Sequence, residues 1–250
     1  MLSDPVFIVV AVLAVLLIGV SKSGFGGAMG SLSVPLLSLL IATPRAAAIM
    51  LPIMLVLDAI GLVVFRGQSD QANLRIIIPG GMIGIVLGAL TFHLVDSRWI
   101  KAMIGIEALL FGVDRLRRVS ADGGESHAPA VAKGLFWSSV SGFTSFISHA
   151  GGPPILQYLL PQGMDRVRLV GTTAIYFAVI NFSKLLPYGV LGLLDVSNAA
   201  IALALLPVAP VGYWLGLKLL KRLPPARFNL AIAVAMLLTG LKLVIDSLLI

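Results

Sequence analysis

Two lysines lie inside long apolar segments of this sequence, where a charged side chain needs a chemical reason. Lys22 belongs to the stretch VSKSGFGGAMGS (Val20 to Ser31), and Lys184 belongs to the stretch VINFSKLL. A lysine near the middle of a bilayer costs on the order of 2.5 to 3.5 kcal/mol, so it usually pairs with an acidic group or faces a functional cavity. The two lysines therefore indicate either an anion-binding site or buried ion pairs.

Glycine-rich stretches in the same apolar segments favour turns that carry further polar groups. One lies at Gly24 to Gly27, and the other combines Gly142 with HAGGPP (His149 to Pro154). A non-helical turn in the hydrocarbon core persists only where protein buries it or where it lines a wet cavity. The helix after such a turn begins with free N–H groups and a positive dipole end, and both attract anions. We therefore expect lysine charge, serine hydroxyls and backbone N–H groups to form a cradle for a small anion. The predicted anion-binding residues are Ser21, Lys22, Ser23, Gly24, Phe25, Gly26, Gly27, Ser148, His149, Gly151, Gly152, Thr172, Asn181 and Lys184.

Acidic side chains in the apolar segments offer the lysines a second role. Asp58 and Glu107 are the candidates. On this structural interpretation Lys22 pairs with Asp58, and Lys184 extends along apolar surface toward the membrane interface. The sequence leaves the binding and the structural interpretations open. We also predict Asp58, His149 and Glu107 as proton-coupling residues, His149 because the charge of a histidine can change near neutral pH.

The composition is that of a chain that spans a membrane several times. Of 250 residues, 58% are hydrophobic and 12% are charged, compared with about 25% charged in soluble proteins. The mean hydropathy is +1.04, and most long windows are apolar enough for a membrane helix. The absence of cysteine excludes disulfides and thiolate chemistry. The first 20 residues contain no basic residue, so we interpret them as a retained first segment rather than a cleaved signal peptide.

The hydrophilic stretch RLRRVSADGGESHAPAVAK divides the chain into two similar halves. We predict an N-terminal transmembrane repeat at residues 1–114, a cytoplasmic linker loop at 115–132 and a C-terminal transmembrane repeat at 133–250. The landmarks that match in order are Gly24 to Leu40 with Gly142 to Leu160, Asp58 with Asn181, and Pro79 to Gly88 with Pro207 to Gly216. The alternative is a chance likeness, because Gly-x-x-x-Gly faces are common in membrane helices.

Each half opens with an apolar segment, such as residues 5–41, that is long for one crossing of roughly 20 to 25 residues. Each segment is either one broken crossing or a helical hairpin that returns to its starting side. Basic residues near membrane ends collect on the cytoplasmic side. Hairpins leave only Arg45, Arg98 and Lys101 on the other side, whereas single crossings divide the basic residues more evenly.

The sequence therefore predicts an all-α polytopic membrane fold of two inverted repeats. Each repeat is a broken or re-entrant hairpin followed by three transmembrane helices, and both termini lie outside. The net charge of +7 then reflects the excess of basic residues on the cytoplasmic side, so we expect no nucleic-acid partner. Inverted repeats with interrupted helices that meet near the midplane are a recurring transporter architecture.

The stretches GVSKSGFGGAMGSLSVPLLSLL and PRAAAIMLPIMLVLDAIGLVVFRG, with the degenerate copy that contains HAGGPP, cover nearly the whole chain. They resemble the sulfite exporter TauE/SafE family of bacterial permeases. The resemblance implies a multi-pass protein of the bacterial cytoplasmic (inner) membrane that carries small sulfur-containing anions such as sulfite, sulfoacetate or other sulfonates, often as an exporter. Family members commonly have Lys-Gly-Gly before the phenylalanine where this chain has Lys22-Ser23-Gly24, which leaves the substrate open.

We expect a secondary transporter in which one repeat rocks against the other around the two turns, a cycle known as alternating access. An anion channel with the same basic turns is one alternative, and uptake in place of export is another. The sequence contains no serine-hydrolase elbow, His-Glu-x-x-His or phosphate-binding loop, so we expect no enzymatic activity, no cofactor and no metal site. The expected partners are a small anion and membrane lipid, and the small-residue faces would also suit a homodimer.

Overall fold

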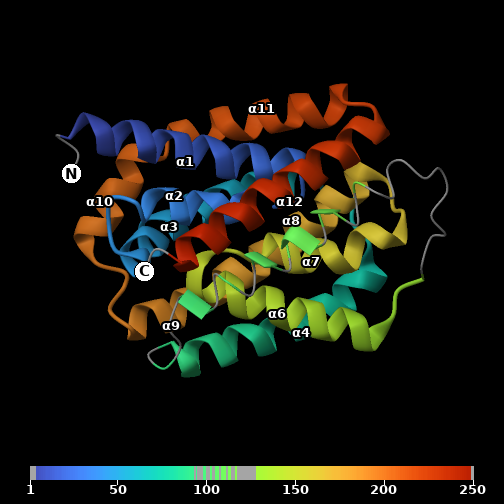
Figure 1. Ribbon diagram of the computed structural model, residues 1–250, viewed down its shortest axis with the longest axis horizontal. Helices are drawn as coiled ribbons and strands as arrows, with labels where there is room; N and C mark the ends of the chain where they lie inside the picture. The colour runs from blue at the N-terminus through green and yellow to red at the C-terminus, as the bar shows by residue number, and fades with distance from the viewer. Residues whose placement is uncertain are drawn as a thin grey trace.

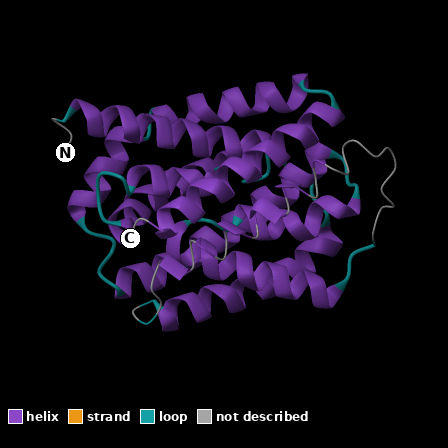
Figure 2. Ribbon diagram, viewed as in Figure 1, coloured by secondary structure: helices purple, strands orange, loops and turns teal. Residues whose placement is uncertain are grey.

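The computed structural model contains helices and connecting turns. It describes residues 4–92, 94, 98–99, 102, 105–106, 108–110, 112–113, 116 and 128–248. Every regular element in these residues is helical (Figure 2), which confirms the predicted all-α class. Glu107 and most of the predicted linker loop lie outside the described residues, so the predictions for them stay predictions.

The helices form a bundle whose long axes lie roughly along one direction (Figure 1). The first half contains α1 (Pro5–Gly24), η1 (Gly30–Leu32), α2 (Ser33–Leu37), α3 (Thr43–Val64) and α4 (Gln71–Thr91). The second half contains α6 (Val131–Ser148), α7 (Gly152–Leu159), η2 (Leu160–Gln162), α8 (Arg166–Ser183), α9 (Leu185–Val190), α10 (Val196–Leu205), α11 (Val208–Arg222) and α12 (Pro225–Leu248).

Aspartate side chains begin four of these helices. Asp4, Asp70, Asp165 and Asp195 precede α1, α4, α8 and α10, and each accepts a hydrogen bond from a backbone N–H of the helix it precedes. Such capping satisfies donors that have no partner inside the helix. These acidic residues therefore serve at helix ends, whereas Asp58 lies inside α3.

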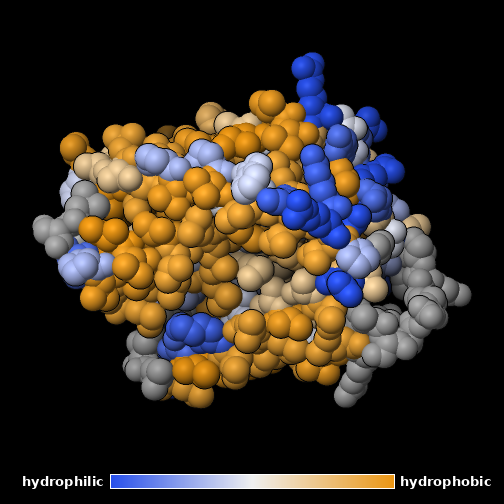
Figure 3. Space-filling model, turned by 90° about the horizontal axis from the view of Figure 1, so that it is seen from above, coloured by the Kyte–Doolittle hydropathy of each residue, from blue (hydrophilic) through white to orange (hydrophobic). Residues whose placement is uncertain are grey.

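The lengths and composition of the helices confirm a multi-pass membrane protein. Among the described residues, five helices are long and apolar enough to cross a membrane, namely Pro5–Gly24, Thr43–Val64, Gln71–Thr91, Arg166–Val190 and Ala226–Leu248. The pair α10 and α11, bent by 49°, would add a sixth crossing if it acts as one. A broad apolar surface covers the side of the bundle (Figure 3), as contact with lipid requires.

Each half begins with a long helix, a turn and a short returning arm. α1 runs inward from the end of the bundle that carries the N-terminus, whereas α6 enters from the opposite end (Figure 1). The returning arms comprise residues 30–37 and 152–162, fewer than the roughly 20 residues that a full crossing needs. The arms therefore favour re-entrant hairpins over fully spanning ones.

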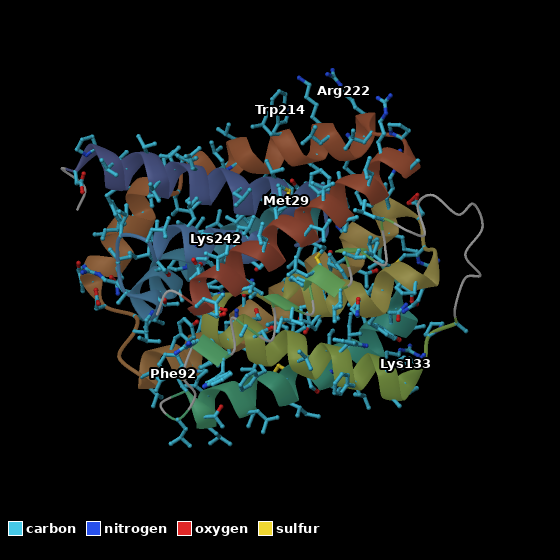
Figure 4. The ribbon with its side chains drawn as sticks, viewed as in Figure 1. Met29, Phe92, Lys133, Trp214, Arg222 and Lys242 are labelled. Atoms are coloured by element: carbon cyan, nitrogen blue, oxygen red, sulfur yellow. The ribbon has the colours of Figure 1, made fainter. Side chains whose placement is uncertain are left out.

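The positions of basic residues decide between hairpins and single crossings. Lys133 and Arg222 lie at the same end of the bundle (Figure 4), where hydrophilic residues also gather in Figure 3. Arg45 donates a hydrogen bond of 3.0 Å to Asn198 in α10, at the end that carries the N-terminus. Single crossings would have placed Arg45 and Arg222 on one face and Lys133 on the other. These positions favour the hairpin arrangement over single crossings, and they are consistent with inverted repeats.

The first helix of each half packs against the other half. α1 packs along α11 of the second half, and α6 packs along α4 of the first half. Both contacts are close because glycines lie in them: a Cβ added at Gly212 would lie 2.8 Å from a backbone oxygen of α1, and one added at Gly84 would lie 2.1 Å from a backbone oxygen of α6. This reciprocal packing is consistent with the predicted repeats.

One landmark of the repeat is out of register. Gly142 was expected in the second turn but lies inside α6, where it packs against Gly81 of α4. When α1 and α6 are aligned at their last residues, Gly24 in α1 corresponds to Ser148 in α6. The Gly-Phe pairs matched in the sequence therefore do not occupy equivalent places, and Gly142 contributes to helix packing.

We predict that Gly142→Ala destabilises the protein, by about 1 to 3 kcal/mol, because the new methyl group would meet the backbone of Gly81. The matched control is Gly189→Ala in α9, where an added Cβ has no neighbour within 4 Å. Alanine suits an exposed helix better than glycine, so the control should be neutral or slightly stabilising. Thermal unfolding in detergent measures both, and equal midpoints would contradict the close packing of α4 and α6.

Candidate functional site

The first tip, residues 25–29, is a tight turn held by the end of α1. The Ser21 carbonyl accepts a hydrogen bond from the Gly27 N–H at 3.0 Å, and the Ser21 hydroxyl accepts one from the Met29 N–H at 3.0 Å. Gly26 and Gly27 have φ angles of 59° and 93°, which side chains other than glycine rarely adopt. Met29 lies between the two ends of the bundle (Figure 4), so the first tip is an interior turn.

The second tip, residues 149–151, ends α6 in a different way. His149 has a φ of 54° and is the one described non-glycine residue with a positive φ, a conformation with a steric cost. The backbone N–H of Ala150 donates to the Thr144 carbonyl at 3.3 Å, and the Ser141 hydroxyl donates to the Gly151 carbonyl at 2.6 Å. The hydroxyl-rich end of α6 therefore fixes the histidine in this turn.

The two tips touch through their main chains. A Cβ added at Gly152 would lie 2.1 Å from the carbonyl oxygen of Gly27, so only glycine fits at this contact. Residues 24–27 and 148–152 are all buried. The turns predicted at both tips are therefore present, and the structure brings them together.

A continuous chain of polar side chains lies beside the tips. Lys22 of α1 forms an ion pair with Asp58 Oδ1, and the Asn181 side chain of α8 donates to Asp58 Oδ2 at 2.7 Å. Lys184 Nζ then donates to Asn181 Oδ1 at 2.9 Å and contacts His149 Nδ1 at 2.9 Å. All five residues are buried, so this polar cluster joins the two halves away from solvent.

Hydrogen bonds join His149 and Lys184 to each other and to both halves of the chain. His149 Nε2 lies 3.0 Å from the Ala47 carbonyl oxygen, an atom that only accepts, so Nε2 must carry a proton. Lys184 Nζ has three partners: Ser145 Oγ at 2.8 Å, Asn181 Oδ1 and His149 Nδ1. A serine hydroxyl can donate or accept, so a neutral lysine and a charged lysine both satisfy the three contacts. The pair therefore adds two basic groups to the polar cluster.

The polar cluster contains more basic groups than acidic ones. Lys22, His149 and Lys184 are basic, whereas Asp58 is the one carboxylate among the five residues of the cluster. The sequence interpretation that paired Lys22 with Asp58 is confirmed, but its companion is wrong because Lys184 is fully buried and does not reach the interface. An uncompensated charge in a low-dielectric interior attracts an ion of opposite sign.

Several predicted binding residues hold the fold rather than face the polar cluster. The Ser23 hydroxyl donates to the carbonyls of Gly19 and Tyr213 and so ties α1 to α11. Thr172 donates to Arg168 and accepts from the Asp70 N–H at the start of α4. The Ser148 hydroxyl lies 3.5 Å from a carbonyl of its own helix, and Phe25 stacks on Phe228 of α12 with a centroid distance of 5.9 Å.

The backbone contributes fewer free N–H groups than expected. In the first tip the N–H groups of residues 25 and 27–29 already donate to acceptors in α1 or in the tip itself. In the second tip Pro153 and Pro154 occupy the first turn of α7, and proline has no N–H. The side chains of Lys22 and Lys184, rather than free backbone N–H groups, therefore give this region its basic character.

A small cavity opens on the Lys22 side of the polar cluster, with room for about one water molecule. Its lining residues are Lys22, Leu57, Asp58, Gly61, Thr173, Ala174, Phe177 and Tyr213. Sequence reasoning chose Thr172 where the structure has Thr173. Helical spacing could have found it, because Thr173, Phe177 and Asn181 are four residues apart and share one face of α8.

Tyr213 also lines the cavity and was not among the predicted binding residues. In the sequence it is marked only by the small residue Gly212 before it. Its ring is 2% exposed, and its hydroxyl has no hydrogen-bond partner in the described residues. No pattern in the sequence indicates that Tyr213 lines the same cavity as Lys22, because the two residues come from opposite halves of the chain.

The comparisons with known proteins place this geometry in a family. The family model described as Sulfite exporter TauE/SafE matches residues 11–243 of the chain. Searches of curated proteins and of solved structures find no match. The match covers α1 from residue 11 onward, both tips, and α12 as far as residue 243. It agrees with the expectation of a membrane permease rather than an enzyme, and the chain belongs to the sulfite exporter TauE/SafE family.

Proposed function

We propose that this protein is a secondary transporter that exports small sulfur-containing anions, such as sulfite, sulfoacetate or other sulfonates, across the bacterial cytoplasmic membrane. Family membership supports the sulfur-containing substrate. The excess of basic over acidic groups in the polar cluster supports an anion independently, because it comes from Lys22, Lys184, His149 and Asp58 and not from the family. That buried excess of basic groups is the observation on which the proposal depends.

The cost of a buried charge explains why an anion would bind. An isolated charge in a low-dielectric interior is costly unless a partner compensates it. Asp58 pairs directly with Lys22 and is linked to Lys184 through Asn181, so it can neutralise only one lysine when both are protonated. A bound anion would complete the pairing, so binding energy arises without any backbone cradle.

Alternating access accounts for the small size of the cavity. A space for about one water molecule is too small for sulfite, so the halves must separate before an anion enters. The hairpins enter from opposite ends of the bundle and meet at Gly27 and Gly152. Rocking of one half against the other would therefore open the polar cluster toward one side at a time. By the positive-inside rule, the end with Lys133 and Arg222 would face the cytoplasm.

Proton coupling follows from competition for Lys22. The Asp58 carboxylate already holds the Lys22 ammonium, and an anion in the adjacent cavity would repel that carboxylate. A proton on Asp58 would remove the repulsion and release Lys22 to the anion. Anion and proton would then bind together, with the basic groups of His149 and Lys184 nearby.

We predict that Lys22→Ala and Lys184→Ala each reduce sulfite transport in proteoliposomes at least ~10-fold, because each removes a buried charge that favours the anion. Lys242→Ala is the control: this lysine lies in an apolar helix but pairs with Asp246, away from the polar cluster. Since Lys22→Ala leaves Asp58 unpaired, Lys22→Ala/Asp58→Asn should restore folding without restoring transport. Full transport in both single variants would exclude the polar cluster as the site, and sulfite flux without counterflow would favour a channel.

We predict that Asp58→Asn abolishes the rise of transport rate with acidity. In the proposed cycle a proton binds together with the anion and frees Lys22, so wild-type transport should increase as the proton concentration rises. Asparagine resembles the protonated carboxyl at every pH, so the variant should give a flatter profile. Initial rates of sulfite transport between pH 5 and pH 8 measure this. A wild-type profile retained by Asp58→Asn would exclude Asp58 as the proton carrier.

A further inference from the structure

We propose that the oxyanion headgroup of the substrate binds on the Lys22 side of the polar cluster, where the Lys22 ammonium and the Tyr213 hydroxyl donate to its oxygens. This inference rests on the proposed function and deepens it. It assigns a binding role to Tyr213, and it separates the roles of the two buried lysines.

The two lysines differ in how many N–H groups they have left. Lys184 Nζ contacts Ser145, Asn181 and His149, so all three of its N–H directions are occupied. Among the described residues, Lys22 Nζ donates a hydrogen bond to Asp58 alone, and it lies 5.3 Å from the centroid of the Phe177 ring. An ammonium has three donors. Lys22 can therefore bind an anion directly, whereas Lys184 contributes its charge and holds the second tip.

The Tyr213 hydroxyl is a second donor at the same place. It is buried and without a partner among the described residues, although buried hydroxyls are normally hydrogen-bonded. Tyr213 and Lys22 line the same cavity. Gly61 leaves space for the hydroxyl, because a Cβ added there would lie 3.0 Å from it. By contrast, the hydroxyls of Tyr176 and Tyr188 each donate a hydrogen bond to a carbonyl of α6.

The remaining walls define the class of ligand. Leu57, Ala174 and Phe177 are apolar, and the Thr173 hydroxyl already donates to the Val170 carbonyl. The cavity thus offers donors to oxygens on one side and apolar contact on the other. This arrangement suits an oxyanion headgroup next to a short apolar segment, as in sulfite itself or in the sulfonate and methylene groups of sulfoacetate. The lining comes from α1, α3, α8 and α11, so it draws on both halves and would widen when they separate.

The test compares Tyr213→Phe with Tyr176→Phe in proteoliposomes, using sulfite and sulfoacetate as the probes. Tyr213→Phe removes a hydroxyl that has no partner among the described residues, so folding should be unaffected. If the hydroxyl donates to the anion, the KM for both probes should rise about 10-fold or more, the usual effect of losing a hydrogen bond to a charged group. Tyr176→Phe removes a hydroxyl bonded to Ser138, so it should lower the thermal midpoint and leave KM unchanged.

A second variant narrows the cavity and keeps Tyr213 in the sequence. Gly61→Ala would place a methyl group between Tyr213 and Ala174, so it should also raise the KM for both probes. Unchanged KM values in Tyr213→Phe overturn the inference, even if the pH profile moves, because the hydroxyl would then bind water rather than substrate. A wild-type protein that transports neither probe would overturn the proposed function itself. Loss of transport in Lys22→Ala with normal KM in Tyr213→Phe would leave the function standing and remove only this assignment.

Discussion

The structure depends on one carboxylate that lies among several basic groups in the middle of the bundle. Asp58 is the acidic partner in the polar cluster, and it contacts Lys22 directly and is linked to Lys184 through Asn181. In a medium where unpaired charge is costly, this arrangement fixes α1, α3 and α8 relative to one another. It also joins the two halves of the chain at one point.

Much of the fold follows from the sequence because the membrane imposes strong rules. Apolar length predicts the crossings, and the distribution of basic residues predicts the hairpins. The structure contains helices long enough to cross a membrane, and the shared end of Lys133 and Arg222 and the opposite position of Arg45 are consistent with the hairpins. The glycine turns were also predictable, because few other residues adopt the positive φ angles of Gly26 and Gly27.

The details of the site were harder to predict, since they depend on which atoms are already hydrogen-bonded. The sequence shows that Ser23 and Thr172 are polar, but not that their hydroxyls are used in holding helices together. The sequence shows that Tyr213 is amphipathic. It does not show that Tyr213, from the second half, lines the same cavity as Lys22, from the first half. Helical spacing along α8 would have favoured Thr173 over Thr172, so that error was avoidable. The omission of Tyr213 was not avoidable, because contacts between the two halves leave no periodic pattern in the sequence.

The contact between Gly27 and Gly152 has a mechanical consequence. Main-chain atoms of the two glycines meet there with no side chain between them, so this contact can part without a change of rotamer. The hydrogen bonds of Asn181 with Asp58 and of His149 with the Ala47 carbonyl cross between the halves and would have to break or shift when they separate. An anion that weakened the hold on Asp58 would thereby lower the barrier to its own transport.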